Sequence, residues 1–503
     1  MSSGSSEKRA FGKIFLLIIL ALIVIAAIIA QVLLRPDRSA SIKIVYTGGI
    51  QGHYQYEENV SAGYGRIVAL TESYKDDGYD VMLLDSGGSL GGSSSVELSS
   101  GENMLRLMNA SGYQAMTPGS LDFVYGIDQL KALRAQAEFP FLVCNLKNAD
   151  GSNVFEDYKV MNINGVRIGI TGVTDGMNTE LASRAGLVYE DPVVSVRNAV
   201  SEMGGRVDAF IVIASVSDSE TIAQIAQIDD VNLVITSAGD EKSLEGITGG
   251  AVLVSPASGG ETIGVVTMNI HRNEVSFENE EIGENVYAEL TDSPEVSEEA
   301  AAVEEELRLR ADVSFALSDQ YISRNETDTK DVDSEEDEEE DPLRTSAAGQ
   351  LTADAMLREG STWSADAALI RSSEIRGELT GSKMKVSDIL SLYDDDLYLV
   401  VCKMTGGELR AILEKCVEKG LEDPEEKLQA SGISCQINEG REMGSCVSDI
   451  IISSSKIDDA GIYYVAMTSR MAEEFGYGPH SSGFCAAGRS IAGIVSDYIA
   501  GDK

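Results

Sequence analysis

IKIVYTGGIQG, residues 42–52, and VMLLDSGG, residues 81–88, each join a run of aliphatic and β-branched residues to a glycine-containing turn. Such runs are typical of strands in a largely buried sheet. Further runs of this kind recur along the chain, and helical stretches lie between them, for example residues 65–74, 102–109 and 127–137. This alternation predicts an α/β domain. The other predicted strands of this unit are Phe139–Asn145, Val166–Thr171, Ala209–Ala214, Asn232–Thr236 and Ala251–Ser255.

The N-terminal segment Ile14–Leu34 contains 21 residues, of which Gln31 is the only polar one. A helix of that length spans roughly 31 Å, which matches the hydrocarbon core of a bilayer. A cleaved signal peptide has a shorter apolar region, of about 7–15 residues. We therefore expect residues 13–35 to form an uncleaved transmembrane signal-anchor, residues 1–12 a cytoplasmic tail, and the rest of the chain an extracytoplasmic part. A buried core helix is the alternative.

The composition limits the classes of partner and site. The chain has 39 Lys and Arg against 82 Asp and Glu, a net charge of −43. Proteins that bind nucleic acid need clustered basic residues, so we expect no nucleic-acid partner. The chain has only three histidines, His53, His271 and His480. This count excludes any mechanism that needs four.

Two charge-rich stretches interrupt the α/β pattern. Residues 298–310 favour a helix, and residues 328–341 carry ten acids and one lysine. Such an acidic block cannot bury surface, so we interpret residues 276–342 as an acidic linker, partly helical and partly disordered. A calcium-binding tract is the alternative, although no regular ligand loop is visible.

A second α/β unit follows the acidic linker. We assign residues 41–275 to the first domain and residues 343–503 to the second. The second unit has predicted helices at Ser346–Leu357 and Gly407–Lys419, and predicted strands at Ala367–Arg371, Tyr398–Lys403, Ser434–Ile437, Val447–Ser453 and Ile462–Thr468.

Short motifs follow one another in a characteristic order through both units. In the first they are TGGIQG (47–52), GYGRI (63–67), LLDSGG (83–88), MNASGYQAMTPGSLDFVYG (108–126), FPFLVCNL (139–146) and INGVRIGITGVT (163–174). In the second they are SAAGQLTADAML (346–357), IRSSEIRGEL (370–379), MTGGELRAILE (404–414) and LQASGI (428–433). This order resembles the 5′-nucleotidase family, which includes UDP-sugar hydrolases and bifunctional metallophosphatases. The resemblance implies a metallophosphoesterase-like four-layer α-β-β-α sandwich, followed by a C-terminal nucleotide-binding α/β domain.

The same resemblance implies a two-metal phosphoesterase site, and this sequence departs from it at every ligand motif. Such a site needs carboxylate oxygens and imidazoles at the ends of strands. The positions that would carry them are Gly49, Gln51, Gly88, Ser120, Leu121, Val216, Ala238 and Asp240. Few of these side chains can bind a metal, so we expect no catalytic residues and no metal cofactor.

Three side chains near these motifs remain candidates for a residual metal site. His53 lies two residues beyond a lost ligand position, and we prefer to interpret it as a loop histidine. Asp85 keeps the aspartate of the LLD motif and could hold one ion, although a structural role in capping the glycine turn is favoured. Asp240 is the third, because it retains a side-chain oxygen.

The nucleotide pocket that the resemblance implies in the second domain is also incomplete. Arg376 falls on the arginine of the family, and Tyr477 roughly matches an aromatic residue that stacks on the base. Arg371 stands where an asparagine is usual, Lys427 replaces an aromatic residue, and YDDD (393–396) places acids beside any incoming phosphate. Such acids oppose an anionic ligand. We favour Arg376 as an ion-pair partner of a nearby acid over nucleotide binding.

Cys435 and Cys446 bracket a polar stretch between two predicted strands. This spacing suits a hairpin closed by a disulfide bond, and an extracytoplasmic location would preserve one. Buried thiols are the alternative.

Taken together, the sequence favours a membrane-anchored 5′-nucleotidase-like pseudoenzyme, attached through residues 14–34, with a scaffold or binding role toward a protein partner that it does not identify. One alternative is an active 5′-nucleotidase or metallophosphatase with two divalent metals. Another is a receptor-like nucleotide-binding module.

Overall fold

The computed structural model describes residues 39–501, except 178, 237–249, 272–273, 319, 322–342, 344–345, 380–382, 396, 439–444 and 479–483. The predicted cytoplasmic tail and signal-anchor lie outside the described residues. In the part of the chain that is described, no helix is both long and apolar enough to cross a membrane.

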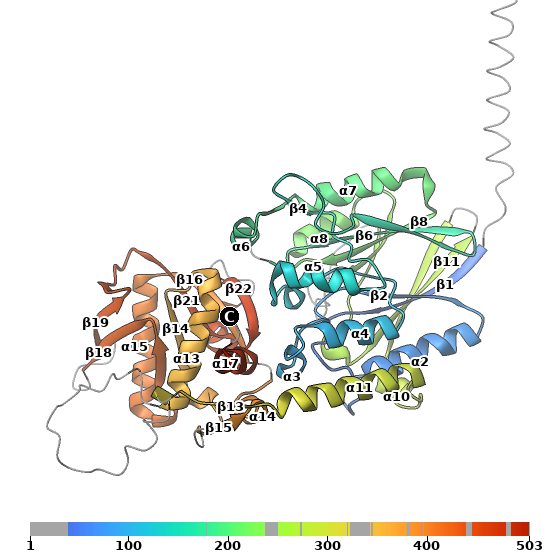
Figure 1. Cartoon of the computed structure of the whole chain (residues 1–503). Helices are drawn as coiled ribbons and strands as arrows, with labels where there is room; N and C mark the ends of the chain where they lie inside the picture. Colours follow the sequence, from blue (N-terminus) through green and yellow to red (C-terminus); the bar gives the residue numbers. More distant parts are fainter. Residues whose placement is uncertain are drawn as a thin grey trace, which may run out of the picture.

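Two five-stranded sheets form the N-terminal domain (Figure 1). The first has the order β12 (Glu274–Ile282), β11 (Ile263–His271), β1 (Ser39–Thr47), β2 (Asp80–Asp85) and β3 (Ala115–Met116). The second has the order β10 (Val252–Val254), β9 (Val231–Thr236), β8 (Ala209–Ser215), β6 (Val166–Thr174) and β5 (Tyr158–Ile163). Strands β1, β2 and β3 are parallel, as are β6, β8, β9 and β10.

Successive side chains along the strands of this domain point to opposite faces of each sheet, so each sheet has an inner and an outer apolar face. Ile44 of β1 and Leu84 of β2 pack against Ile211 of β8, in a core between the two sheets. Their chain neighbours Val45 and Leu83 point to the opposite face of the first sheet. That outer face is covered by α2 (Gly63–Asp76), α4 (Glu102–Ala110), α5 (Gly126–Gln136) and α11 (Pro294–Ala311), whereas α7 (Pro192–Met203) and α8 (Ser219–Ala226) cover the second sheet. The arrangement is the predicted four-layer α-β-β-α sandwich.

Smaller elements connect these layers. They are α3 (Ser94–Glu97), η1 (Ser120–Asp122), β4 (Leu146–Asn148), α6 (Thr179–Arg184), β7 (Leu187–Tyr189), η2 (Gly204–Arg206), η3 (Ser258–Gly260) and α10 (Glu284–Tyr287). The predicted strand Phe139–Asn145 is wrong, because only isolated bridges occur there, at Phe141 and Leu142. Pro140 has no backbone N–H to donate to a ladder.

The predicted boundary between the first domain and the linker is also wrong. Strand β12 pairs with β11, and its residues Val275 and Phe277 pack toward the core between the sheets. Polar or charged residues alternate with these two apolar ones, so the sequence analysis did not recognise a strand. Helix α11 then buries Val296, Val303 and Leu307 against the N-terminal domain. These residues recur with the helical period, so the acidic helix has an apolar stripe.

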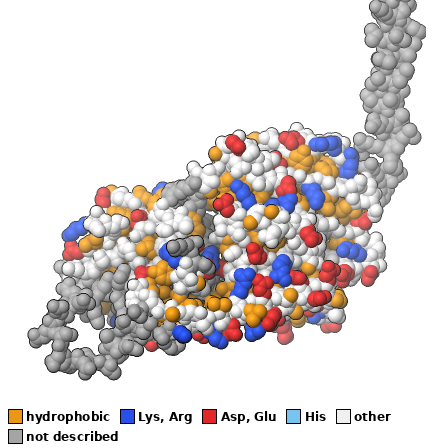
Figure 2. Space-filling view, in the orientation of Figure 1, with side chains coloured by type: hydrophobic (Ala, Val, Ile, Leu, Met, Phe, Trp, Pro, Cys, Tyr) orange, Lys and Arg blue, Asp and Glu red, His pale blue; other side chains and the backbone are white. Residues whose placement is uncertain are grey.

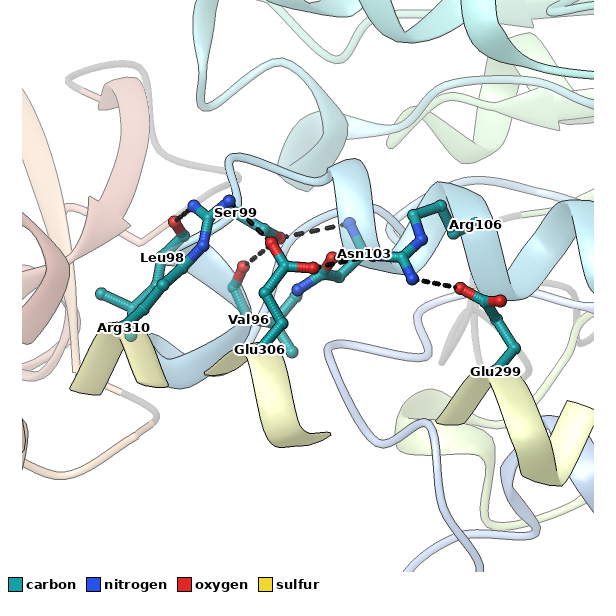
Figure 3. A network of polar contacts seen from close by, with 8 residues as sticks. All are labelled: Val96, Leu98, Ser99, Asn103, Arg106, Glu299, Glu306 and Arg310. Carbon is teal, nitrogen blue, oxygen red and sulfur yellow. Dashed lines mark hydrogen bonds and ion pairs between the residues drawn. The ribbon is translucent and has the colours of Figure 1, made fainter. Parts of the chain in front are cut away.

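Ion pairs hold α11 against α4 (Figure 3). Arg106 of α4 contacts Glu299 at 2.6 Å and Glu306 at 2.8 Å, and Arg310 contacts Glu306 at 2.7 Å and donates to the carbonyl of Leu98. The N-terminal domain therefore extends to the end of α11. The acidic block 328–341 lies outside the described residues.

One mixed five-stranded sheet forms the C-terminal domain. Its order is β17 (Leu428–Ser431), β14 (Ala367–Arg371), β21 (Ile462–Thr468), β16 (Tyr398–Thr405) and β22 (Phe484–Ser490). One face packs on α13 (Ala347–Gly360), α14 (Val386–Leu390) and α17 (Ile491–Ala500). The other packs on α15 (Gly406–Glu422), α16 (Ser469–Glu474) and the hairpin β18 (Ile433–Ile437) and β19 (Val447–Ile452), which β20 (Ser455–Lys456) extends. Strand β13 (Ser314–Ala316) pairs with β15 (Lys383–Lys385), and η4 (Ser361–Trp363), η5 (Ser372–Glu374) and η6 (Pro424–Glu426) complete the domain.

Acidic and basic side chains are interspersed over the face of the N-terminal domain that Figure 2 shows. The described side chains on that face do not form a continuous basic patch, although the whole chain carries a net charge of −43.

Candidate functional site

The candidate site lies where the parallel strands of the N-terminal domain end. Strand β1 ends at Thr47 and β2 at Asp85, and these two residues are register partners. The loops that follow β1, β2 and β3 meet at this edge. The carboxyl edge of parallel strands is where α/β folds place ligand sites, and the motifs TGGIQG, LLDSGG and PGSLDF all lie here.

Asp85 is fully buried at this edge. Its carboxylate accepts hydrogen bonds from Thr47 Oγ1 at 2.8 Å, from Ser89 Oγ at 2.8 Å and from the Gly87 amide at 2.8 Å. Burial, and then the nearby Asp122 carboxylate, raise the pKa of Asp85 to about 7, against the effect of these hydrogen bonds. The contacts match the expected structural role of Asp85 in the glycine turn.

Asp122 of η1 is a second buried carboxylate, and the sequence analysis did not single it out. It accepts hydrogen bonds from four backbone amides: Gly88 at 2.6 Å, Gly119 at 2.7 Å, Leu90 at 2.8 Å and Ser89 at 3.1 Å. Burial raises the pKa of Asp122, and these amides oppose the rise. The available signal was its place in PGSLDF, directly after Ser120 and Leu121, which the resemblance aligns with ligand positions.

Backbone fills the space between the loops. The Gly49 amide donates to the Gly87 carbonyl at 2.7 Å, and the Gln51 amide donates to the Gly88 carbonyl at 3.2 Å. Gly88 has φ +72°, and a Cβ atom there would lie 3.2 Å from Gly49 Cα. Gly49 and Gly88, the two positions that the resemblance aligns with metal-binding carboxylates, are thus in backbone contact, which leaves little room for a side chain on Gly88.

The other predicted positions do not assemble around Asp85. Gln51 Nε2 donates to Ser258 Oγ at 3.2 Å, and Val216 is buried in the core beneath α7 and α8. His53 Nδ1 lies 4.0 Å from a Glu57 carboxylate oxygen, on a partly exposed loop, which fits a loop histidine. Ala238 and Asp240 lie outside the described residues.

The described residues do not fit a pair of divalent metals. Two metals held side by side need several anionic or imidazole ligands with free lone pairs. Here the two carboxylates of the edge already accept seven hydrogen bonds, three on Asp85 and four on Asp122. Within the described ranges, no group of three His, Cys, Asp or Glu side chains could hold a metal ion.

In the C-terminal domain, Arg376 is engaged by an acid of the YDDD stretch. Its guanidinium contacts Asp394, which also pairs with Arg470 at 2.6 Å. Arg371 is buried, pairs with Glu474 at 2.6 Å, and lies 5.6 Å from the centre of the Phe475 ring. These contacts match the favoured interpretation of Arg376 as an ion-pair residue.

Tyr477 packs beside the hydrophobic core under α15. Burial, and then the charge of Glu408, raise the pKa of Tyr477 to about 12. Among the described contacts, no hydrogen bond, ion pair or ring contact joins Tyr477 directly to Arg376.

The predicted disulfide bond between Cys435 and Cys446 is absent from the structure, which has both as buried thiols. The two residues lie on the paired strands of the expected hairpin, but the register separates them. Cys446 accepts a hydrogen bond through its carbonyl from the Asn438 amide, three residues beyond Cys435. Three residues of a strand span about 10 Å, which is too far for a disulfide bond.

Comparisons with known proteins cover both domains. Residues 325–477 match the family model of the 5′-nucleotidase C-terminal domain. The Vibrio cholerae 5′-nucleotidase is 24% identical over 188 residues, which are 36% of this chain and 34% of that protein. The Rattus norvegicus 5′-nucleotidase is 30% identical over 150 residues, 28% of this chain and 26% of that protein. The matches thus span about a third or less of these relatives.

Solved structures resemble the chain over most of its length. The Haemophilus influenzae NAD nucleotidase has a TM-score of 0.68 at 14% identity, over 92% of this chain and 96% of that one. The 5′-nucleotidase precursor from Thermus thermophilus has a TM-score of 0.52 at 19% identity, over 91% and 96%. At these identities the likeness establishes the two-domain fold alone.

Proposed function

Since the chain belongs to the 5′-nucleotidase family, we propose that it is a catalytically inactive member that keeps the two-domain scaffold for binding or assembly at a membrane. Residues 14–34 would anchor it, with the folded domains on the extracytoplasmic side. The observation that carries the proposal is the carboxylate of Asp122, which is closed off by four backbone amides at the edge where the family binds metal.

The chemistry at this edge supports inactivity. Hydrolysis of a phosphate ester by two metals requires ligands that hold the ions and lower the pKa of a bound water. Glycine at positions 49 and 88 supplies no ligand atom, and Leu121 and Val216 supply none either. The raised pKa of Asp85 means that its charged form is disfavoured when it is buried beside Asp122. No metal cofactor is part of this proposal.

The test is hydrolysis by the purified full-length chain in detergent. AMP, UDP-glucose and a chromogenic phosphodiester would be offered with manganese, zinc or cobalt, beside the Vibrio cholerae 5′-nucleotidase as a positive control. We expect no turnover above the buffer rate and substoichiometric metal by elemental analysis.

Two bound metals per chain and metal-dependent turnover of about 1–1000 per second, lost in Asp85→Ala, would overturn the proposal. That result would favour an active 5′-nucleotidase with a different ligand set.

A further inference from the structure

A buried carboxylate of the N-terminal domain is inserted into the C-terminal domain. Glu97 ends the short helix α3, and its side chain is 1% exposed. Its two oxygens accept the Ser490 amide at 2.8 and 3.0 Å, and Oε2 accepts the Ser490 hydroxyl at 2.8 Å. Ser490 is the N-cap of α17, so a carboxylate from one domain lies at the start of a helix of the other.

Arg489 supplies a positive charge at the same place. Its Nε lies 3.7 Å from Glu97 Oε2, and its Nη1 contacts Asp497 of α17 at 2.5 Å. The fit is close on the other side as well, because a Cβ atom on Gly493 would lie 2.5 Å from Glu97 Oε2. The C-terminal domain therefore presents an amide, a hydroxyl and a guanidinium to one carboxylate.

Two further contacts cross the same boundary. Ser94 Oγ, at the start of α3, donates to Asp395 at 2.5 Å. Tyr398 OH donates to the carbonyl of Gly92 at 3.0 Å. Helix α3 lies beside α17 at the junction of the domains (Figure 1), and β22 contacts η1, which carries Asp122.

We infer that Glu97 is an interdomain latch, which fixes the two domains in one arrangement through Ser490 and Arg489. Separation of the domains would expose Glu97 and Arg489 together and break every contact of the carboxylate at once. Opening costs the hydrogen bonds to the Ser490 amide and hydroxyl together with the contact to Arg489, because all of them are made to one carboxylate. The domains should therefore move as one body as long as Glu97 is in place.

The test measures the distance between the domains in the full-length chain in detergent. Spin labels on Lys75→Cys of α2 and Lys456→Cys of β20 report that distance by pulsed electron paramagnetic resonance, with the chain lacking both introduced cysteines as the labelling blank. We expect one narrow distance distribution for the latched protein. In Glu97→Ala it should become broad, while circular dichroism stays unchanged.

Glu156→Ala is the matched control, because Glu156 pairs with Arg134 within the N-terminal domain. It should leave the narrow distribution intact. Glu97→Gln keeps the shape of the side chain but replaces the negative charge beside Arg489 with a neutral amide. The distribution of distances between the spin labels should therefore gain a second, longer component. If Glu97→Ala does not fold, Glu97→Gln decides the matter. A narrow, unshifted distribution in the folded variants would show that Glu97 is not a latch.

Discussion

The Gly88 amide donates a 2.6 Å hydrogen bond to the Asp122 carboxylate. Gly88 stands where the resemblance places a metal-bridging aspartate, and Asp122 belongs to the loop that would carry the next ligands. A carboxylate beside the expected metal position thus accepts a hydrogen bond from a backbone amide. The loops are held by hydrogen bonds between backbone and buried acid, and this arrangement can be tested without knowledge of any ligand.

Asp122→Ala should destabilise the N-terminal domain by about 3–5 kcal/mol, because four buried amides lose their acceptor and water cannot replace it. Chemical denaturation measures the change. Asp218→Ala is the control, since Asp218 also accepts backbone amides, at the exposed start of α8. It should cost only about 1 kcal/mol. Equal losses in the two variants would contradict the role assigned to Asp122.

Gly88→Asp, which restores the family carboxylate, should weaken the fold instead of creating a metal site. The new side chain would need φ +72° and would meet Gly49 beside two buried acids. Gly78→Asp is matched, because Gly78 has φ +89° and no atom within 4 Å of a new Cβ. We expect a loss of about 1–2 kcal/mol for Gly78→Asp and of about 3 kcal/mol or more for Gly88→Asp. Tight manganese binding by Gly88→Asp in calorimetry would argue the opposite.

The buried Asp85 should make stability fall as pH rises from about 4 to 7. Its pKa is raised from 3.8 to about 7 in the folded protein. Within this window the unfolded chain releases a proton that the folded chain keeps, so a rise in pH favours unfolding. Asp85→Asn should flatten this part of the stability curve. An unchanged slope in Asp85→Asn would assign the pH dependence to other groups.

The buried thiols should resist alkylation in the native protein. Burial raises the pKa of Cys144 to about 12 and that of Cys416 to about 11, so neither forms appreciable thiolate at pH 8. After unfolding without a reductant, Cys435 and Cys446 should each react with iodoacetamide. Mass spectrometry of the peptides measures both results, and a linked pair of peptides would contradict the structure at the hairpin.

Protease added to intact cells should remove the folded domains and leave an N-terminal fragment in the membrane fraction. The apolar run 14–34 is long enough to span a bilayer, and it is longer than the apolar region of a cleaved signal peptide, which has about 7–15 residues. An antibody against an N-terminal tag detects the fragment. A soluble mature chain that begins after residue 30 would show that the segment is a cleaved signal.

The sequence by itself determined the fold class, because period-two and continuous apolar runs such as those of β2, β14 and β21 follow from burial alone. It also determined that Gly49 and Gly88, which the resemblance aligns with metal ligands, have no side-chain ligand atom. The sequence analysis assigned β12 and α11 to the linker, because their many charged residues outnumber the apolar residues that recur on one face. A local pattern also does not show which element such a face packs against.

Only the tertiary structure decided which groups meet at the carboxyl edge of β1, β2 and β3. Asp122 and Gly88 are 34 residues apart, and Glu97 and Ser490 are separated by 393. Contacts over such separations depend on how the loops and domains pack. The same holds for Cys435 and Cys446, because a bulge and the strand register set their distance, and spacing along the chain does not. The residue type alone tells whether a side chain carries a ligand atom. Its hydrogen-bond partners depend on which distant segments the fold brings together.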